Sequence, residues 1–295
     1  MKKIAILGCE SSHARHFLSY MRDSADFSDI EVIGIYSDNI KASLSLAEEF
    51  DVNIMNSYDE AVDKLDGLII TARDGNTHYK YALPYIKSKI PMLIDKPFTQ
   101  SEDDAIALIS ALKEADIKLV GGSALKYDDV IRRLKNKAEK SENILGGVVR
   151  APLMSNSEYG GFFFYAQHLV EMVCEIFGPF PKSVTANRVD KQTYVTFHYD
   201  TFDCMGIYVE NNHKYYAAVM TDKASYGEEI YPDEARSLLP CQLAEFKQLL
   251  YGGKLTTPYE KLIAPVFIMN AIKRSLEEKT EQIINYAIKK QYGLI

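Results

Sequence analysis

Cysteine and metal-binding patterns are scarce in this sequence. The chain has four cysteines, and they lie far apart without a Cys-x-x-Cys pair: Cys9, Cys174, Cys204 and Cys241. This spacing fits neither a disulfide framework nor a zinc site, so we expect reduced thiols and no metal.

Positive charge and long apolar runs are also lacking. The formal net charge of −7 argues against a broad surface for nucleic acid. No window approaches the roughly 18 apolar residues of a membrane span. The apolar run after Met1-Lys2-Lys3 ends too soon for a signal peptide. We therefore expect a cytoplasmic protein that binds neither nucleic acid nor membranes.

The first 122 residues alternate strand and helix patterns. Short apolar runs of this kind are typical of strands covered on both faces. Capping boxes at Ser57 with Glu60 and at Ser101 with Asp104 predict helix starts. The pattern predicts a Rossmann-like, doubly wound parallel sheet of α/β class. Strands are expected at 3–7, 31–36, 67–71, 92–94 and 118–120.

After Gly121-Gly122 the pattern changes to α+β. Helices are expected over 128–140, 162–177, 235–251 and 259–278, and strands over 147–151, 183–189, 193–199, 204–209 and 215–220. Asn211-Asn212 predicts a hairpin turn between the last two strands. We expect an open, mostly antiparallel sheet here, and hence domains at 1–122 and 123–295.

The turn after the first strand carries a damaged nucleotide fingerprint. A dinucleotide-binding turn reads Gly-x-Gly-x-x-Gly, whereas Gly8-Cys9-Glu10-Ser11-Ser12-His13 keeps only the first glycine. A carboxylate at Glu10 opposes a pyrophosphate unless it points away. Ser11 and Ser12 add hydroxyls near a helix N-terminus, which suits an anion. A sheet that binds no dinucleotide is the alternative.

The end of the second strand leaves the cofactor type open. An acidic residue at this place usually binds the ribose hydroxyls of NAD. Ser37 stands at that place and Asp38 follows it. Ser37 with Lys41 suits the 2′-phosphate of NADP, and Asp38 opposes it, so both cofactors remain candidates.

The segment Asp95-Lys96-Pro97 follows a predicted parallel strand. Open α/β sheets bind ligands at this edge, and neighbours and desolvation readily move the pKa of a lysine. A plain surface turn is the alternative. The Lys96–Pro97 bond is a candidate cis peptide.

The predicted helix over 162–177 is mostly apolar but carries a polar stripe. Tyr165, His168, Glu171 and Glu175 recur at steps of three and four residues, which places them on one helical face. The stripe is either the solvated side of the helix or the lining of a cleft. Two ligands at three-residue spacing are too weak a signal for a metal.

Together these motifs resemble the glucose–fructose oxidoreductase and inositol dehydrogenase family (Gfo/Idh/MocA). The stretch 71–78 resembles the family's Ala-Thr-Pro-x-x-x-His loop, and Asp95-Lys96-Pro97 resembles its Glu-Lys-Pro signature. Gly160-Gly161 and the stretch 167–171 resemble the active-site helix. The chain departs from the family in its broken fingerprint, in its short length and in Phe164, where many members have an acid.

The resemblance implies two lobes, a nicotinamide cofactor and a small substrate. Lys96 and His168 would converge across one crevice, with Glu171 or Tyr165 orienting His168 or replacing the missing acid. NAD or NADP would be bound by Gly8, Cys9, Glu10, Ser11, Ser12, His13, Ser37, Asp38, Thr71, Asn76, His78, Asp95 and Lys96. Family members associate through the exposed sheet, so a homo-oligomer, either a dimer or a dimer of dimers, is expected.

The function expected on this resemblance is hydride transfer. An NAD(P)-dependent oxidoreductase would act on a hydroxyl of a small sugar-, polyol- or hydroxy-acid-like substrate. Glu10 and Phe164 motivate an alternative, a non-catalytic ligand-binding or regulatory protein on the same scaffold. A lyase or hydrolase with a tightly held nucleotide is a third hypothesis.

Overall fold

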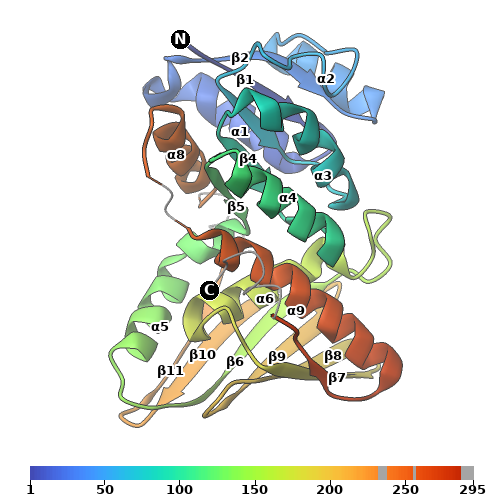
Figure 1. The fold of residues 1–295 in the computed structure, drawn as a ribbon. Helices are drawn as coiled ribbons and strands as arrows, with labels where there is room; N and C mark the ends of the chain where they lie inside the picture. Colours follow the sequence, from blue (N-terminus) through green and yellow to red (C-terminus); the bar gives the residue numbers. More distant parts are fainter. Residues whose placement is uncertain (232–237, 255–256, 287–295) are drawn as a thin grey trace. The chain divides into compact units, whose positions relative to one another are not determined.

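The chain folds into two compact units in a computed structural model that describes residues 1–231, 238–254 and 257–286 (Figure 1). The first unit comprises Met1–Gly122 with Leu239–Tyr259, and the second comprises Ser123–Leu238 with Glu260–Ile295. The expected boundary after residue 122 recurs here. The segment 239–259 differs from the expectation, because it packs in the first unit rather than the second.

The first unit is built on a parallel sheet with the order β2-β1-β3-β4-β5. Ile54 adds a single parallel bridge to Ile35 of the outer strand β2. If this bridge is counted as a shortened edge strand, the order is that of the Rossmann fold. The predicted doubly wound sheet is confirmed. The strands are β1 (Lys2–Leu7), β2 (Ile30–Tyr36), β3 (Gly67–Ile70), β4 (Met92–Asp95) and β5 (Leu119–Gly122).

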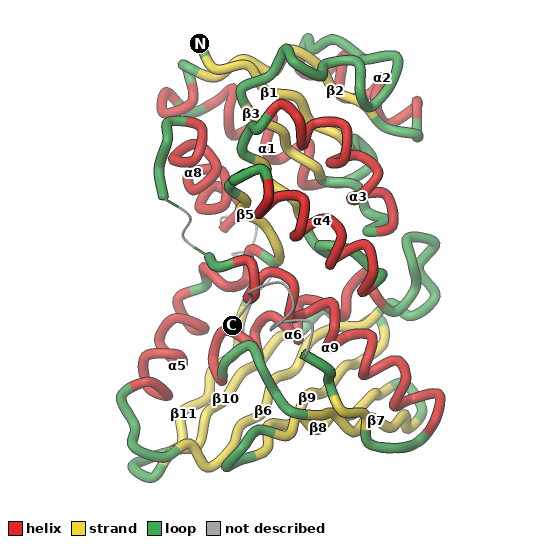
Figure 2. Tube along the Cα trace, in the orientation of Figure 1, coloured by secondary structure: helices red, strands yellow, loops and turns green. Residues whose placement is uncertain are grey.

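Helices cover this sheet (Figure 2). They are α1 (Ser12–Asp23), α2 (Ile40–Phe50), α3 (Asn76–Ala82), α4 (Glu102–Glu114) and α8 (Leu239–Leu250), with short 3₁₀ turns η1 (Ala25–Phe27) and η2 (Leu83–Ser88). The capping box of α4 is confirmed, because Ser101 Oγ accepts a hydrogen bond from the Asp104 N–H at 3.3 Å.

The capping box at Ser57 is wrong. The chain forms turns there, and the Glu60 carboxylate accepts hydrogen bonds from the backbone and side chain of Asn56. Residue Asp63 then adopts a left-handed φ of 65°. Since the bridge at Ile54 precedes it and β3 begins at Gly67, the segment is too short for a full crossover helix.

Helix α8 packs against α1 and β5 of the first unit. Leu243 and Phe246 are fully buried, and Gln242 Nε2 donates a hydrogen bond to the Gly122 carbonyl at 2.8 Å. An amphipathic pattern shows that a helix packs on something, but not on which partner. Residues 235–237 of the expected helix lie outside the described residues.

The second unit contains a sheet with the order β11-β10-β6-β9-β8-β7-β12. Strands β6 and β9 run parallel and the other pairs run antiparallel, so the mostly antiparallel sheet is confirmed. The strands are β6 (Ile144–Leu153), β7 (Ser183–Val189), β8 (Gln192–His198), β9 (Asp203–Glu210), β10 (Tyr215–Thr221), β11 (Ser225–Ile230) and β12 (Gln282–Ile283).

The predicted hairpin at Asn211-Asn212 is wrong. Strand β6 lies between β9 and β10 and forms hydrogen bonds with both. The turn residues therefore carry the chain across β6, a strand that lies about sixty residues earlier in the sequence. Strand β10 instead forms a hairpin with β11, the strand that follows it.

Helices α5 (Asp129–Glu139), α6 (Phe163–Phe177) and α9 (Tyr259–Glu278) accompany this sheet, with the short turn η3 (Ala124–Tyr127) before α5 (Figure 1). Along β8, Thr193, Val195 and Phe197 are buried, whereas Tyr194, Thr196 and His198 are partly exposed. One face of the sheet thus carries the core. Within the described ranges, no helix combines the length and apolar character that a membrane span needs.

Candidate functional site

The turn after β1 keeps the geometry of a nucleotide-binding turn. Gly8 has a φ of +105°, and a Cβ there would lie 2.1 Å from the backbone nitrogen of Ala72. Ser11 caps α1 by accepting a hydrogen bond from the His13 N–H at 3.2 Å, and Ser12 is exposed. The first turn of α1 has no acidic residue. The positive end of this helix therefore suits an anion.

The Glu10 side chain is turned away from that helix end. Its carboxylate accepts hydrogen bonds from Ser37 Oγ at 2.5 Å and from the Arg73 N–H at 3.0 Å. These donors follow β2 and β3 respectively. A carboxylate beside a pyrophosphate is acceptable only if it points away, and Glu10 has this orientation. The turn therefore fits a dinucleotide.

Asp38 lies in a separate cluster of tyrosines. Its carboxylate accepts hydrogen bonds from Tyr36 Oη at 2.7 Å and from Tyr81 Oη at 3.0 Å. The Tyr36 hydrogen bond is the main reason that the pKa of Asp38 lies below its usual value, and the Tyr81 bond and the Lys80 charge add to it. Asp38 is thus engaged by protein groups.

Four residues predicted to bind cofactor have side chains in protein surroundings. Thr71 is fully buried and donates to the Gly8 carbonyl at 3.0 Å. His78 is also fully buried, with Nε2 2.8 Å from the Ala72 carbonyl and Nδ1 3.2 Å from the Phe98 carbonyl, and burial lowers its pKa. Burial raises the pKa of Cys9 to about 11. Asn76 is exposed, and its Nδ2 donates to Gln100 Oε1 at 3.2 Å.

The carboxyl end of β4 carries a buried charge cluster. The Lys96–Pro97 bond is cis. Asp95 Oδ2 lies 2.6 Å from His13 Nδ1, while Asp95 Oδ1 is buried without a hydrogen-bond partner among the described residues. Burial raises the pKa of Asp95, but the charge and hydrogen bond of His13 and the charge of Lys96 outweigh it, so the pKa falls below 3.8.

Lys96 is itself only 8% exposed. Burial lowers its pKa below 10.5, and the nearby Arg73 charge lowers it further, while Asp95 opposes both effects. A lysine with a depressed pKa at a ligand-binding strand end is a candidate for hydrogen bonding or proton exchange with a substrate.

In the second unit, Ser123 connects two polar residues of α6. Its Oγ lies 2.7 Å from His168 Nδ1, and its N–H donates to Glu171 Oε2 at 2.7 Å. Glu171 also accepts a hydrogen bond from Gln167 Nε2. Burial raises the pKa of Glu171 to about 7, against opposing effects of Lys126, Gln167 and Ser123. This carboxyl therefore titrates near neutral pH.

Aromatic rings surround His168. The Tyr165 ring lies edge-on at 5.4 Å and the Tyr215 ring at 6.2 Å. Phe164 is buried against Tyr165. The four residues of the polar stripe are all partly exposed, and Glu175 pairs with Lys135 of α5 at 2.5 Å. Since Lys96 and His168 belong to different units, their convergence stays a prediction.

The sequence reasoning missed Ser123 and Arg73. Ser123 directly follows Gly121-Gly122 at the end of β5, and its place after a parallel strand was the available signal. Arg73 contributes its backbone N–H to Glu10. A backbone donor has no signature in the side-chain sequence, so only the structure could reveal it.

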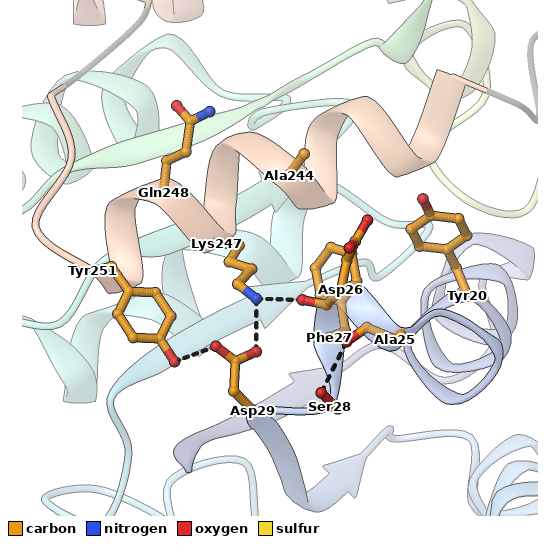
Figure 3. Close-up of a pocket in the computed structure, with 10 residues that line it drawn as sticks. All are labelled: Tyr20, Ala25, Asp26, Phe27, Ser28, Asp29, Ala244, Lys247, Gln248 and Tyr251. Carbon is orange, nitrogen blue, oxygen red and sulfur yellow. Dashed lines mark hydrogen bonds and ion pairs between the residues drawn. The ribbon is translucent and has the colours of Figure 1, made fainter.

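A further pocket lies at the opposite edge of the first sheet. Asp29, just before β2, pairs with Lys247 Nζ at 2.7 Å and accepts from Tyr251 Oη at 2.7 Å (Figure 3). The polar groups that line this pocket form hydrogen bonds with one another, and these bonds join α8 to the sheet. Ligands of open α/β sheets bind at the carboxyl edge instead. Across the described residues, no three His, Cys, Asp or Glu side chains gather as a metal would require.

Comparison with known proteins gives a family model and a curated relative that match this chain. Residues 2–122 match the family model described as "Oxidoreductase family, NAD-binding Rossmann fold" (GFO_IDH_MocA). The chain is 24% identical over 255 residues to glucose-6-phosphate 3-dehydrogenase of Bacillus subtilis (strain 168), covering 78% of this chain and 70% of that protein.

Two solved structures have the same fold. The first is myo-inositol dehydrogenase from Lactobacillus casei in complex with NAD(H) and myo-inositol, with a TM-score of 0.84, 11% identity and 97% of each chain covered. The second is a myo-inositol dehydrogenase from Corynebacterium glutamicum ATCC 13032, with a TM-score of 0.82, 17% identity and coverage of 97% of this chain and 99% of that one. The match of residues 2–122 to the family model confirms the predicted resemblance for that part of the chain.

Proposed function

We propose that this protein is an NAD(P)-dependent dehydrogenase, because residues 2–122 match the family model described as "Oxidoreductase family, NAD-binding Rossmann fold". Its substrate is a small sugar, polyol or hydroxy acid, from which a hydride leaves the carbon that bears a hydroxyl. The names of the Bacillus subtilis relative and of the Lactobacillus casei complex support the sugar and polyol class.

The observation that carries this proposal is the environment of Lys96. The side chain ends at the carboxyl edge of β4, it is 8% exposed, and burial together with Arg73 lowers its pKa. Burying an ammonium costs stability, so its place at a ligand-binding edge favours a functional role over a surface turn.

The proposed chemistry divides the work between the cofactor and the protein. A bound nicotinamide supplies the carbon that accepts or returns the hydride. Lys96 donates a hydrogen bond to the substrate oxygen and stabilises its developing negative charge. His168 takes the hydroxyl proton, and we assign this to Nε2 because Nδ1 bonds Ser123. Tyr165 and Glu171 position His168, one by its ring contact and the other through Ser123.

An assay with NAD⁺ and NADP⁺ over a panel of inositols, sugars, sugar phosphates and hydroxy acids tests the proposal. Formation of reduced nicotinamide is the readout. For an active substrate, Lys96→Met and His168→Ala should each lower kcat by about a hundredfold or more. Lys87→Met is the matched control, because Lys87 is a well-exposed lysine of the same unit. The proposal would be refuted if none of the nicotinamide dinucleotides bound at millimolar concentration.

Phe164 favours a second candidate, a non-catalytic protein that binds a sugar-like ligand. The residue is buried among aromatic rings, so it offers no carboxylate for proton transfer. Stabilisation by a ligand in a thermal-shift screen, without dinucleotide binding or turnover, would favour this function over the dehydrogenase.

We also propose a homo-oligomer, a dimer or a dimer of dimers, formed through the partly exposed face of the second unit's sheet. Met205 and Met220 are each 37% exposed on strands β9 and β10 and support such a contact. Light scattering tests this proposal by comparing the molar mass of the double variant Met205→Glu/Met220→Glu with that of the unaltered chain. A monomeric unaltered chain would refute it.

A further inference from the structure

Glu10 occupies an unusual place for an acidic residue. It stands where a dinucleotide fingerprint has its second glycine, yet its carboxylate reaches the end of β2. Ser37 Oγ, on the residue directly after β2, donates to Oε2 at 2.5 Å. The Arg73 N–H, beyond the end of β3, donates to Oε1 at 3.0 Å. The carboxylate is therefore held at the strand end where an acid ordinarily binds the adenosine ribose of NAD.

The residue that the sequence offers for that role is otherwise engaged. Asp38 accepts hydrogen bonds from Tyr36 and Tyr81, and Lys80 Nζ lies 4.0 Å from its carboxylate. Tyr81 is only 2% exposed, so this contact is part of the packed structure. Asp38 is thus bonded to the tyrosine cluster, whereas Glu10 is the carboxylate bonded to Ser37, which stands at the expected ribose position.

Resting on the proposed NAD(P) binding, we propose that Glu10 supplies the carboxylate for the adenosine ribose hydroxyls and thereby selects NAD over NADP. Each carboxylate oxygen has two lone pairs, so Glu10 can accept from the ribose hydroxyls while keeping its bonds to Ser37 and Arg73. The 2′-phosphate of NADP would instead meet a carboxylate of the same charge, which lowers affinity.

Ser37 fits this assignment better than a role in phosphate binding. Its hydroxyl already donates to Glu10 and accepts from the Asn39 N–H at 3.1 Å. With its proton directed to Glu10, the hydroxyl presents no donor to a phosphate oxygen. The alternative that Ser37 and Lys41 bind a 2′-phosphate would require the Ser37 hydroxyl to give up its hydrogen bond to Glu10.

The test is a calorimetric titration with ADP-ribose and 2′-phospho-ADP-ribose, which report the adenosine half without any turnover. The unaltered chain should bind ADP-ribose more tightly by about tenfold or more. Glu10→Gln keeps the shape of the side chain and removes its charge, so it should reduce this preference by about tenfold, mainly through tighter binding of the phosphorylated ligand. Glu48→Gln removes an exposed carboxylate from the same unit and should leave the preference unchanged.

Two results would overturn the assignment of Glu10. One is equal or tighter binding of the phosphorylated ligand by the unaltered chain. The other is a preference for ADP-ribose that Glu10→Gln leaves intact. If neither ligand binds and NADH and NADPH also fail to bind, the proposed function falls together with this inference. Binding without dependence on Glu10 removes only the inference.

Discussion

The Nδ1 atom of His13 lies 2.6 Å from Oδ2 of Asp95, so the residue at the third fingerprint position is paired with the acid of the Asp-Lys-Pro segment. In a standard fingerprint the third glycine lets the helix pack closely on the strand. Here, two residues that replace glycines make contacts to other strand ends. His13 reaches β4, and Glu10 reaches the ends of β2 and β3.

Removing His13 should destabilise the protein. In His13→Ala the Asp95 carboxylate loses its partner while it stays buried, which should lower the free energy of unfolding by about 2 kcal/mol. Urea unfolding measures this change. The double variant His13→Ala/Asp95→Asn should lose less than the two single changes together. Additive losses would show that the two side chains do not interact.

The same pair predicts a pH dependence. The pKa of Asp95 is lower in the folded state than its ordinary 3.8, so its contribution is present above that pH and is lost as the pH falls through the folded value. The stability advantage of the unaltered chain over Asp95→Asn should therefore shrink below about pH 4. An advantage that grows on acidification would contradict the sign of this shift.

Lys96→Met should stabilise the fold while it removes activity. The pKa of Lys96 is lowered by burial, so the ammonium costs folding free energy at neutral pH, and methionine relieves it. We expect a gain of about 1 kcal/mol in urea unfolding, with no gain for Lys87→Met. A loss greater than about 1 kcal/mol would mean that the ammonium is a structural partner of Asp95.

Glu171 should make stability fall with rising pH. Its folded pKa of about 7 exceeds the ordinary 4.5, so the folded state binds more protons between these values. Stability should drop by about 1–3 kcal/mol across this window, and Glu171→Gln should flatten the dependence. The exposed Glu139→Gln on α5 serves as control for thermal denaturation over the same pH range. Equal slopes for Glu171→Gln and the unaltered chain would refute the assignment.

Comparing Gly8→Ala with Gly252→Ala separates the cost of a steric clash at the Cβ position from the cost of a positive φ. Gly8 has a φ of +105° and a Cβ site 2.1 Å from Ala72 N, whereas Gly252 has a φ of +81° and no atom within 4 Å of its Cβ site. Gly252→Ala should cost about 1 kcal/mol and Gly8→Ala about 3 kcal/mol or more. Equal costs in thermal unfolding would show that the turn can relax away from β3.

Much of the fold could be predicted because the signals are local. The strands of the first sheet are short apolar runs, and Ser101 marks the start of α4 by one hydrogen bond. The errors concern non-local pairing. The insertion of β6 between β9 and β10 defeated the hairpin at Asn211-Asn212, and the surface on which α8 packs has no sequence signature.

The sequence predicted which residues are candidates for the site, but not how their side chains are oriented. Lys96, Asp95, His168 and Glu171 stand out through their place after strands or on one helical face. The direction of Glu10, the pairing of His13 with Asp95 and the bridge through Ser123 depend on contacts between distant segments. Thr71 and His78 matched a loop pattern, and only the structure shows that both side chains are fully buried.

Hydrogen–deuterium exchange with and without NADH shows which edge of the first sheet binds the cofactor. We expect NADH to slow exchange in peptides covering residues 8–13, 71–76 and 95–98, and to leave those covering 25–29 and 244–251 unchanged. Protection confined to the Lys247 edge, or none at saturating NADH, would contradict this expectation.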